Sequence, residues 1–303
     1  MHGGGGECDS TGGEGGGMKI PQGKTIFLWQ IRGVAKGDPA AIAEQAKAMG
    51  ATAVLIKLAG GPNAYNLRQV GIVWVDDLVQ PVIAALEREG IEAWGWQYIY
   101  GEKPAAEADR AIERMGKFQL AGWVIDAEEE LKGKISQAAL YMRRLRDGLP
   151  TASIGLTTYR YPTLHPELPW GELMEKIDFH MPQVYWAESH NPGKQLERCV
   201  REYRALEKRL KLRELPIVPI GAAYREHGWQ PTGDEMREFV AMVKTMGLPG
   251  YSMWEWAAAE RCGLGMALKM LDPLREEPAP ALSVEDRLAR LEKAARLAGW
   301  RLG

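Results

Sequence analysis

Eight short apolar runs, rich in Val, Ile, Trp and Tyr, alternate with longer stretches that have the periodicity of amphipathic helices. This alternation predicts strand–helix units and a parallel sheet, and eight such units with right-handed crossovers close into a (β/α)8 (TIM) barrel. The predicted strands are Ile26–Ile31, Ala53–Leu58, Glu92–Ile99, Gly122–Glu128, Ser153–Thr158, Phe179–Tyr185, Ile217–Ala222 and Gly250–Trp254. The predicted helices are Pro39–Met49, Asp76–Glu89, Ala105–Phe118, Ile135–Arg146, Trp170–Lys176, Pro192–Arg209, Gly233–Lys244 and Gly263–Leu271.

Length supports one large domain, because a barrel over residues 19–275 of the 303 has the usual size of about 250 residues. A doubly wound open sheet is the alternative. It is disfavoured because Ile31–Gly37, after the first strand, lacks the glycine pattern of a phosphate-binding turn.

Both ends of the chain differ from the barrel in composition. Residues 1–18 are glycine-rich, which predicts a flexible arm that becomes ordered only against another surface. Residues 276–282 form a proline-containing linker, and residues 283–303 repeat apolar positions at the spacing of a short amphipathic helix. We expect self-association through residues 1–17 and this helix, while a disordered arm and a helix docked on its own barrel remain alternatives.

Charge and hydropathy narrow the classes of partner. The net charge of −2 leaves no basic footprint for nucleic acid. The longest apolar runs, such as Ala53–Leu58, are far shorter than the roughly 20 residues of a membrane span. Residues 1–18 lack the pattern of a secretory signal, so general export is not expected, although a cell-surface, extracellular or phage-associated location suits the other features.

The fourth predicted strand ends in two carboxylates, Asp126 and Glu128, which the two-residue strand period places on one face. Both side chains should point into the barrel mouth, where repulsion raises the pKa of one carboxyl group. A protonated acid beside an ionised partner suits cleavage of a glycosidic bond. Glu129 and Glu130 fit the solvated start of a helix, where acidic side chains favour the positive end of the dipole.

Polar and aromatic side chains at other strand ends would hold a substrate. Gln183 and Tyr185 share one face of the sixth strand, and Trp254 ends the eighth. Gln30 on the first strand and Tyr98 on the third are further candidate binding residues. Glu255 points to the opposite face from Trp254 and is therefore a weaker catalytic candidate.

Other chemistries have weaker support. No pair of the five histidines has a metal-ligand spacing, so neither a metal nor another cofactor is expected. His180, inside the sixth strand, is interpreted as a hydrogen-bonded structural residue. Lys57 at the end of the second strand could form a Schiff base, but no phosphate-binding loop accompanies strands seven and eight.

These motifs together resemble the glycoside hydrolase barrels of the chitinase (family 18) and phage or bacterial lysozyme (family 25) kind. The resemblance is carried by Asp126-Ala127-Glu128, by Gln183-Val184-Tyr185 and by Gly250 with Trp254. It implies that Glu128 is the acid, that Asp126 orients an N-acetyl group acting as internal nucleophile, that Tyr185 touches this group and that Trp254 forms the floor. The implied activity is retaining cleavage or binding of N-acetylated glycans such as peptidoglycan or chitin.

The chain departs from these families at two places. No acidic residue stands earlier in the strand that leads to Asp126, and the run from Phe27 to Arg32 lacks the aspartate of the lysozyme-type barrels. The alternative function is therefore a retired hydrolase-like barrel that serves as a structural subunit of an extracellular filament, sheath or phage particle.

Overall fold

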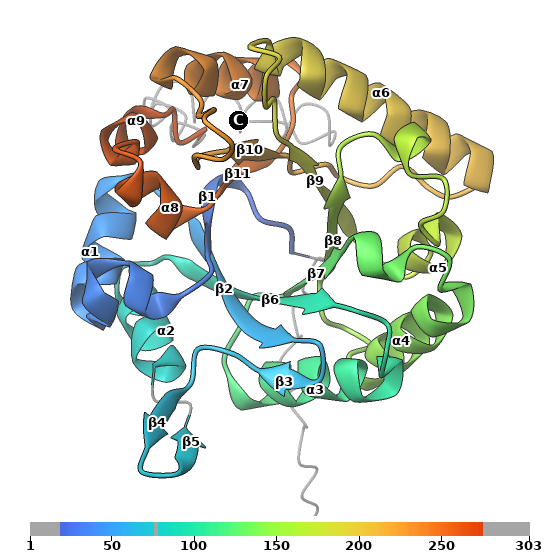
Figure 1. Ribbon diagram of the computed structural model, residues 1–303, viewed down its shortest axis with the longest axis horizontal. Helices are drawn as coiled ribbons and strands as arrows, with labels where there is room; N and C mark the ends of the chain where they lie inside the picture. Colours follow the sequence, from blue (N-terminus) through green and yellow to red (C-terminus); the bar gives the residue numbers. More distant parts are fainter. Residues whose placement is uncertain (1–18, 76–77, 275–303) are drawn as a thin grey trace, which may run out of the picture. The chain divides into compact units, whose positions relative to one another are not determined.

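The computed structural model describes residues 19–75 and 78–274. Eight parallel strands form a closed barrel, since β1 pairs with both β2 and β11 (Figure 1). The barrel strands are β1 (Gly23–Leu28), β2 (Ala53–Gly60), β6 (Glu92–Ile99), β7 (Trp123–Ala127), β8 (Ile154–Tyr159), β9 (Phe179–Val184), β10 (Ile220–Ala222) and β11 (Gly250–Trp254). The predicted (β/α)8 barrel is confirmed.

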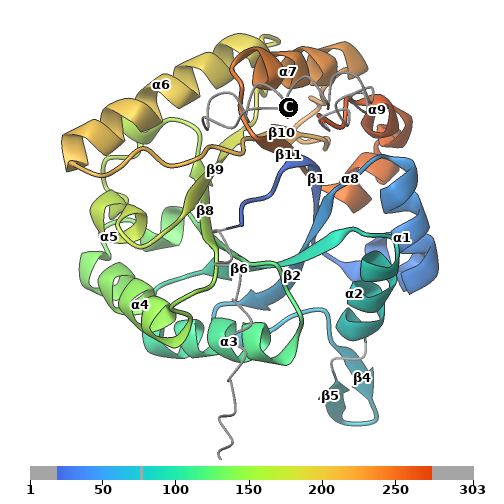
Figure 2. The same cartoon turned by 180° about the vertical axis from the view of Figure 1, so that it is seen from behind.

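Helices surround the barrel on the outside, as both views down its axis show (Figures 1 and 2). They are α1 (Pro39–Ala48), α2 (Val79–Arg88), α3 (Pro104–Lys117), α4 (Ile135–Gly148), α5 (Trp170–Met174), α6 (Pro192–Leu210), α7 (Gly233–Thr245), α8 (Trp256–Arg261) and α9 (Gly265–Met270). Short 3-10 turns, η1 (Ile31–Gly33), η2 (Ala35–Gly37), η3 (Glu129–Leu131) and η4 (Pro162–Leu164), lie in the loops. The start of α7 is fixed by a capping box between Thr232 and Glu235.

Strand β1 begins three residues earlier than the sequence predicts and ends at Leu28, before Ile31 enters η1. The reason is Lys24, because a charged residue near the start of the strand interrupts the apolar run that predicts it. This lysine is 1% exposed, and its ammonium donates hydrogen bonds to the backbone oxygens of Met49, Leu268 and Leu271. Burial lowers the pKa of Lys24 to about 8.

Four elements lie where the sequence predicts none. Strand β3 (Asn63–Ala64) pairs with β2, and β4 (Arg68–Val70) with β5 (Val73–Val75) forms a hairpin that extends away from the barrel wall (Figure 1). Strands of two or three residues are too short to show a period. The fourth is α8, which begins because the Glu255 carboxylate accepts from the backbone N–H groups of Ala257 and Ala258, at 3.3 and 2.7 Å.

Aromatic and aliphatic side chains fill the interior of the barrel. The core includes Phe27, Leu55, Trp94, Trp96 and Phe179. The rings of Trp94 and Phe179 meet edge to face with centroids 5.5 Å apart. A Cβ atom on Gly155 would lie 2.3 Å from the Phe179 ring, so glycine makes room for it. The interior is thus a packed core that supports the mouth above it.

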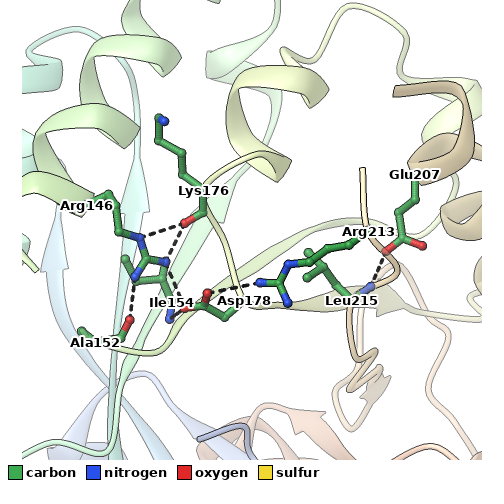
Figure 3. Close-up of polar contacts among 8 residues, drawn as sticks. All are labelled: Arg146, Ala152, Ile154, Lys176, Asp178, Glu207, Arg213 and Leu215. Carbon is green, nitrogen blue, oxygen red and sulfur yellow. Dashed lines mark hydrogen bonds and ion pairs between the residues drawn. The ribbon is translucent and has the colours of Figure 1, made fainter. Parts of the chain in front are cut away.

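A network of polar contacts joins the end of α4 to the starts of β8 and β9, at the N-terminal end of the barrel (Figure 3). The Asp178 carboxylate, 5% exposed, accepts from the Arg146 guanidinium at 2.9 Å and from the backbone N–H of Ile154 at 2.8 Å. Arg146 also donates to the backbone oxygens of Ala152 and Lys176. The buried charge of Asp178 therefore has direct partners.

The arm at residues 1–18, the linker at 276–282 and the amphipathic helix predicted over 283–303 lie outside the described residues. The predictions for these segments, including self-association and the filament alternative, therefore remain predictions. Within 19–75 and 78–274, no helix combines the length and the apolar character needed to cross a bilayer.

Candidate functional site

Inward-pointing side chains from several strands gather at the C-terminal end of the barrel. Asp126 on β7 stands in register with Tyr98 on β6 and with Thr157 on β8. Glu128 follows β7, and Gln183 lies near the end of β9. Because all eight strands run in the same direction, these side chains share the open end of the barrel.

A single amide joins the two carboxylates. The Gln183 Nε2 atom donates to Asp126 Oδ1 at 3.2 Å and to Glu128 Oε1 at 2.8 Å. Asp126 is only 3% exposed, whereas Glu128 is half-buried and open to the mouth. The two carboxyl groups are therefore chemically different, although the sequence places them only two residues apart.

The pKa of Asp126 is raised well above its ordinary value, first by burial and then by the charge of Glu128. A hydrogen bond between the two carboxyl groups acts in the same direction, and the ammonium of Lys57 acts against it. The neutral form of Asp126 is thus favoured. The pair can hold one proton at the mouth.

Two tyrosines hold the acidic residues that follow Glu128. The Tyr98 hydroxyl donates to Glu130 Oε2, and the Tyr159 hydroxyl donates to Glu129 Oε2 at 3.2 Å. Glu129 and Glu130 lie in the first turn of η3 and are exposed, as the helix-start interpretation expects. Burial is the largest cause of the raised pKa of Tyr98, followed by its hydrogen bond to Glu130.

Tyr185 follows β9 and Trp254 ends β11, so both lie at the same end of the barrel as the pair. The Tyr185 ring meets Tyr224 edge to face at 5.4 Å, and burial raises the pKa of Tyr185 well above its ordinary value. Burial also raises the pKa of Tyr224 to about 12. Tyr224 was not among the predicted residues, although it continues the two-residue inward period of β10 beyond the strand end.

The ring of Trp254 packs against three other aromatic rings. Its ring centroid lies 5.3 Å from Phe27 and 5.4 Å from Trp96, and its plane stacks on Trp29 at 6.1 Å and 28°. Trp29 is 39% exposed, so part of this aromatic surface faces solvent. Stacked rings of this kind suit the apolar face of a sugar.

Lys57 brings a cation to the same end of the barrel. Its ammonium lies 4.6 Å from the Tyr65 ring, 4.7 Å from Trp96 and 5.3 Å from Trp29. Burial lowers the pKa of Lys57, and the charge of Asp126 opposes this shift. The aromatic cage and the nearby carboxylate were not visible in the sequence, which identified Lys57 only as the residue at a strand end.

Gln30 is the one predicted site residue that lies apart from the carboxylates. It is exposed beyond the end of β1 and lines a separate cavity of about 850 Å³, here termed the side cavity. Asn63, Tyr65 and Trp74 also line this cavity. The structure therefore gathers six of the seven predicted residues at the mouth and places Gln30 beside it.

Two other residues have structural contacts. Both oxygens of Glu255 cap α8, and its carboxylate faces Arg261 at 3.4 Å. His180 is fully buried, with Nε2 at 3.0 Å from Glu207 Oε1, as the structural interpretation expects. In the described part of the chain, no three His, Cys, Asp or Glu side chains are grouped to hold a metal ion.

No protein-family model matches the chain, and no curated protein matches it in sequence. Solved structures do match. The PgaB (BpsB) glycoside hydrolase domain from Bordetella bronchiseptica has a TM-score of 0.60 at 11% identity, over 84% of this chain and 100% of that domain. The chain has the fold of glycoside hydrolase barrels.

Two further matches have the same architecture. The catalytic domain of a chitinase from Pyrococcus furiosus has a TM-score of 0.59 at 13% identity, over 78% of this chain and 85% of that domain. A family 18 N-acetylglucosaminidase from Paenibacillus barengoltzii has a TM-score of 0.55 at 14% identity, over 82% of this chain and 99% of the enzyme. At such identities, the similarity establishes the fold, and the chemistry has to be argued from the site itself.

Proposed function

We propose that the protein is a retaining glycoside hydrolase that cleaves N-acetylated glycans by a substrate-assisted mechanism. The observation that carries this proposal is the pair formed by Asp126 and Glu128, bridged by Gln183 at the barrel mouth. One member is buried with a raised pKa, and the other is open to a ligand. Such a pair can share one proton, so that one carboxyl group acts as an acid while the other is an ionised orienting group.

In the first step, Glu128 donates its proton to the glycosidic oxygen while the bond between that oxygen and the anomeric carbon breaks. The acetamido oxygen of the same sugar attacks the anomeric carbon and forms a cyclic oxazolinium ion. The Asp126 carboxylate accepts a hydrogen bond from the acetamido N–H and stabilises the positive charge. The proton held by the pair must therefore reside on Glu128 when substrate is bound.

In the second step, Glu128 as carboxylate takes a proton from water while the water oxygen attacks the anomeric carbon. The oxazolinium ring opens, the acetamido group is restored, and the two inversions leave the anomeric configuration retained. The Tyr185 hydroxyl would donate a hydrogen bond to the acetamido oxygen, and the raised pKa of Tyr185 keeps this hydroxyl protonated. Trp254 would support the apolar face of the same sugar.

Two of the structural neighbours act in this chemical class by their descriptions, one as a chitinase and one as an N-acetylglucosaminidase. A mannanase from Thermotoga petrophila has a similar TM-score of 0.58, so fold alone does not select the sugar. The selection of N-acetylated glycans rests on the carboxylate pair and on Tyr185 beside it. A mannan lacks the acetamido group that this mechanism needs.

The test is Glu128→Gln, assayed on chitin oligosaccharides and on peptidoglycan fragments by chromatography of the products. We expect a loss of at least about 10³-fold in kcat, because the amide cannot donate the proton. Glu197→Gln makes the same change on the exposed face of α6 and should retain full activity. Equal activity of Glu128→Gln and the wild type on every cleaved substrate would contradict the assignment.

A further inference from the structure

The side cavity lies between the loop after β1, the segment around β3, the β4–β5 hairpin and α3. Its lining includes Gln30, Arg32, Asn63, Tyr65, Trp74 and Arg110. The volume of about 850 Å³ is enough for more than one sugar ring. The mixture of amide, aromatic and cationic side chains suits a polar ligand with an apolar face.

The charged side chains that line this cavity differ in whether they have an ion-pair partner. Glu113, which also lines it, is paired with Arg110 at 2.5 Å. Arg32 is exposed and has no hydrogen bond or ion pair within residues 19–75 and 78–274. The guanidinium of Arg32 can therefore bind an acidic group of a ligand through two parallel hydrogen bonds.

An aromatic surface faces the same cavity. Trp74 on β5 is 60% exposed, which is unusual for so large an apolar side chain outside a binding surface. The hairpin that carries Trp74 extends beyond the barrel wall in both views (Figures 1 and 2). A sugar ring stacked on Trp74 would keep its polar edge within the cavity.

Residue contacts link the lining of the side cavity to the end of the barrel that carries the carboxylate pair. Tyr65 belongs to the lining of the cavity, and its ring lies 4.6 Å from the ammonium of Lys57. Lys57 in turn acts electrostatically on Asp126. Gln30 follows directly after Trp29, which stacks on Trp254. These two series of neighbouring residues connect the lining of the cavity with the proposed catalytic site.

We propose that the side cavity is a subsite for a carboxylate-bearing sugar of the glycan, with Arg32 binding the carboxylate and Trp74 stacking on a ring. This inference rests on the proposed function, because the carboxylate-bearing sugar belongs to the same chain that is cleaved at Glu128. The guanidinium of Arg32 carries one positive charge, which matches one carboxylate better than a dianionic phosphate. Among N-acetylated glycans, the lactyl-substituted hexosamine of peptidoglycan carries such a group, and chitin does not.

The test measures binding by isothermal titration calorimetry in the Glu128→Gln background, where no ligand is cleaved. One probe is the peptide-free tetrasaccharide of alternating N-acetylglucosamine and N-acetylmuramic acid, and the other is the uncharged chitotetraose. We expect the acidic tetrasaccharide to bind about tenfold more tightly, a free-energy difference of about 1.4 kcal/mol. Because the peptide is absent, any preference must come from the lactyl groups, and the variants below isolate their charge.

Two added substitutions separate the charge from the stacking surface. Arg32→Gln should abolish the tenfold preference and leave the affinity for chitotetraose unchanged. Arg209→Gln, which removes an exposed arginine from the end of α6, should leave the preference intact. Trp74→Ala should weaken both ligands by a similar factor of about ten, because stacking does not depend on the carboxylate.

The outcomes distinguish this subsite from the proposed function. If the background protein binds both tetrasaccharides equally, or if the preference survives Arg32→Gln, the subsite assignment is wrong while the proposed function stands. If neither tetrasaccharide binds, both proposals fail. The subsite is supported if the preference for the acidic tetrasaccharide disappears at high salt and in Arg32→Gln, but persists in Arg209→Gln.

Discussion

Both ends of the barrel contain buried charged side chains, but these side chains have different neighbours at the two ends. At the N-terminal end, Lys24 and Asp178 are buried, and each has several direct hydrogen-bond partners. At the C-terminal end, Asp126 is equally buried but stands beside another carboxylate, which raises its pKa. The first arrangement stabilises the fold, and the second stores unfavourable electrostatic energy at a site that a ligand can reach.

The largest stability effect is expected at the N-terminal end. Asp178→Ala leaves Arg146 without its carboxylate partner and the Ile154 N–H without an acceptor, so the free energy of unfolding should fall by about 2–3 kcal/mol. Chemical denaturation at neutral pH measures this loss. Asp234→Ala removes an exposed carboxylate paired with Arg237 and should change stability by less than about 0.5 kcal/mol.

Activity should not follow stability in these variants. The kcat of Asp178→Ala on a cleaved glycan should stay near the wild-type value at a temperature where the variant is folded. A large fall in kcat without unfolding would show that the two ends are not functionally separate.

At the C-terminal end, we expect a substitution to raise the free energy of unfolding, by a smaller amount. Because folding raises the pKa of Asp126, the folded protein binds more protons than the unfolded chain between the ordinary carboxyl pKa and the raised value. Stability contributed by this group is therefore present at low pH and is lost as pH rises through that window. Asp126→Asn does not ionise and should be more stable than the wild type at pH 7, by about 1 kcal/mol.

Denaturation series from pH 4 to pH 8 for both proteins measure this difference. The difference in unfolding free energy should grow with pH, and the variant should lose most of its activity because the amide cannot act as the orienting carboxylate. A constant difference across this range would mean that Asp126 is ionised throughout.

Sequence periodicity was sufficient where long regular segments decide the structure. The eight strands and the shared face of Asp126 and Glu128 follow from the two-residue strand period, which does not depend on distant contacts. The predicted start of β1 was wrong because the strand contains the buried Lys24. Its partners Leu268 and Leu271 are 244 and 247 positions away in the chain, so no local pattern reveals that this lysine is buried.

Contacts between separate loops could not be predicted in the same way. The aromatic cage around Lys57 combines Trp29, Tyr65 and Trp96 from three segments. Gln30 was placed in the mouth as part of a first strand predicted to reach Ile31, but β1 ends at Leu28 and Gln30 lines the side cavity. Such positions depend on loop conformation rather than on strand period.

The most direct test of the account follows the first product of cleavage by proton NMR. Wild-type protein is mixed with a β-linked N-acetylglucosamine oligosaccharide, and the anomeric protons of the new reducing end are recorded before mutarotation equilibrates them. Substrate-assisted catalysis at Asp126 and Glu128 predicts that the β-anomer appears first. Initial release of the α-anomer, or no cleavage of any N-acetylated glycan, would contradict the proposal that this end of the barrel is a retaining hydrolase site.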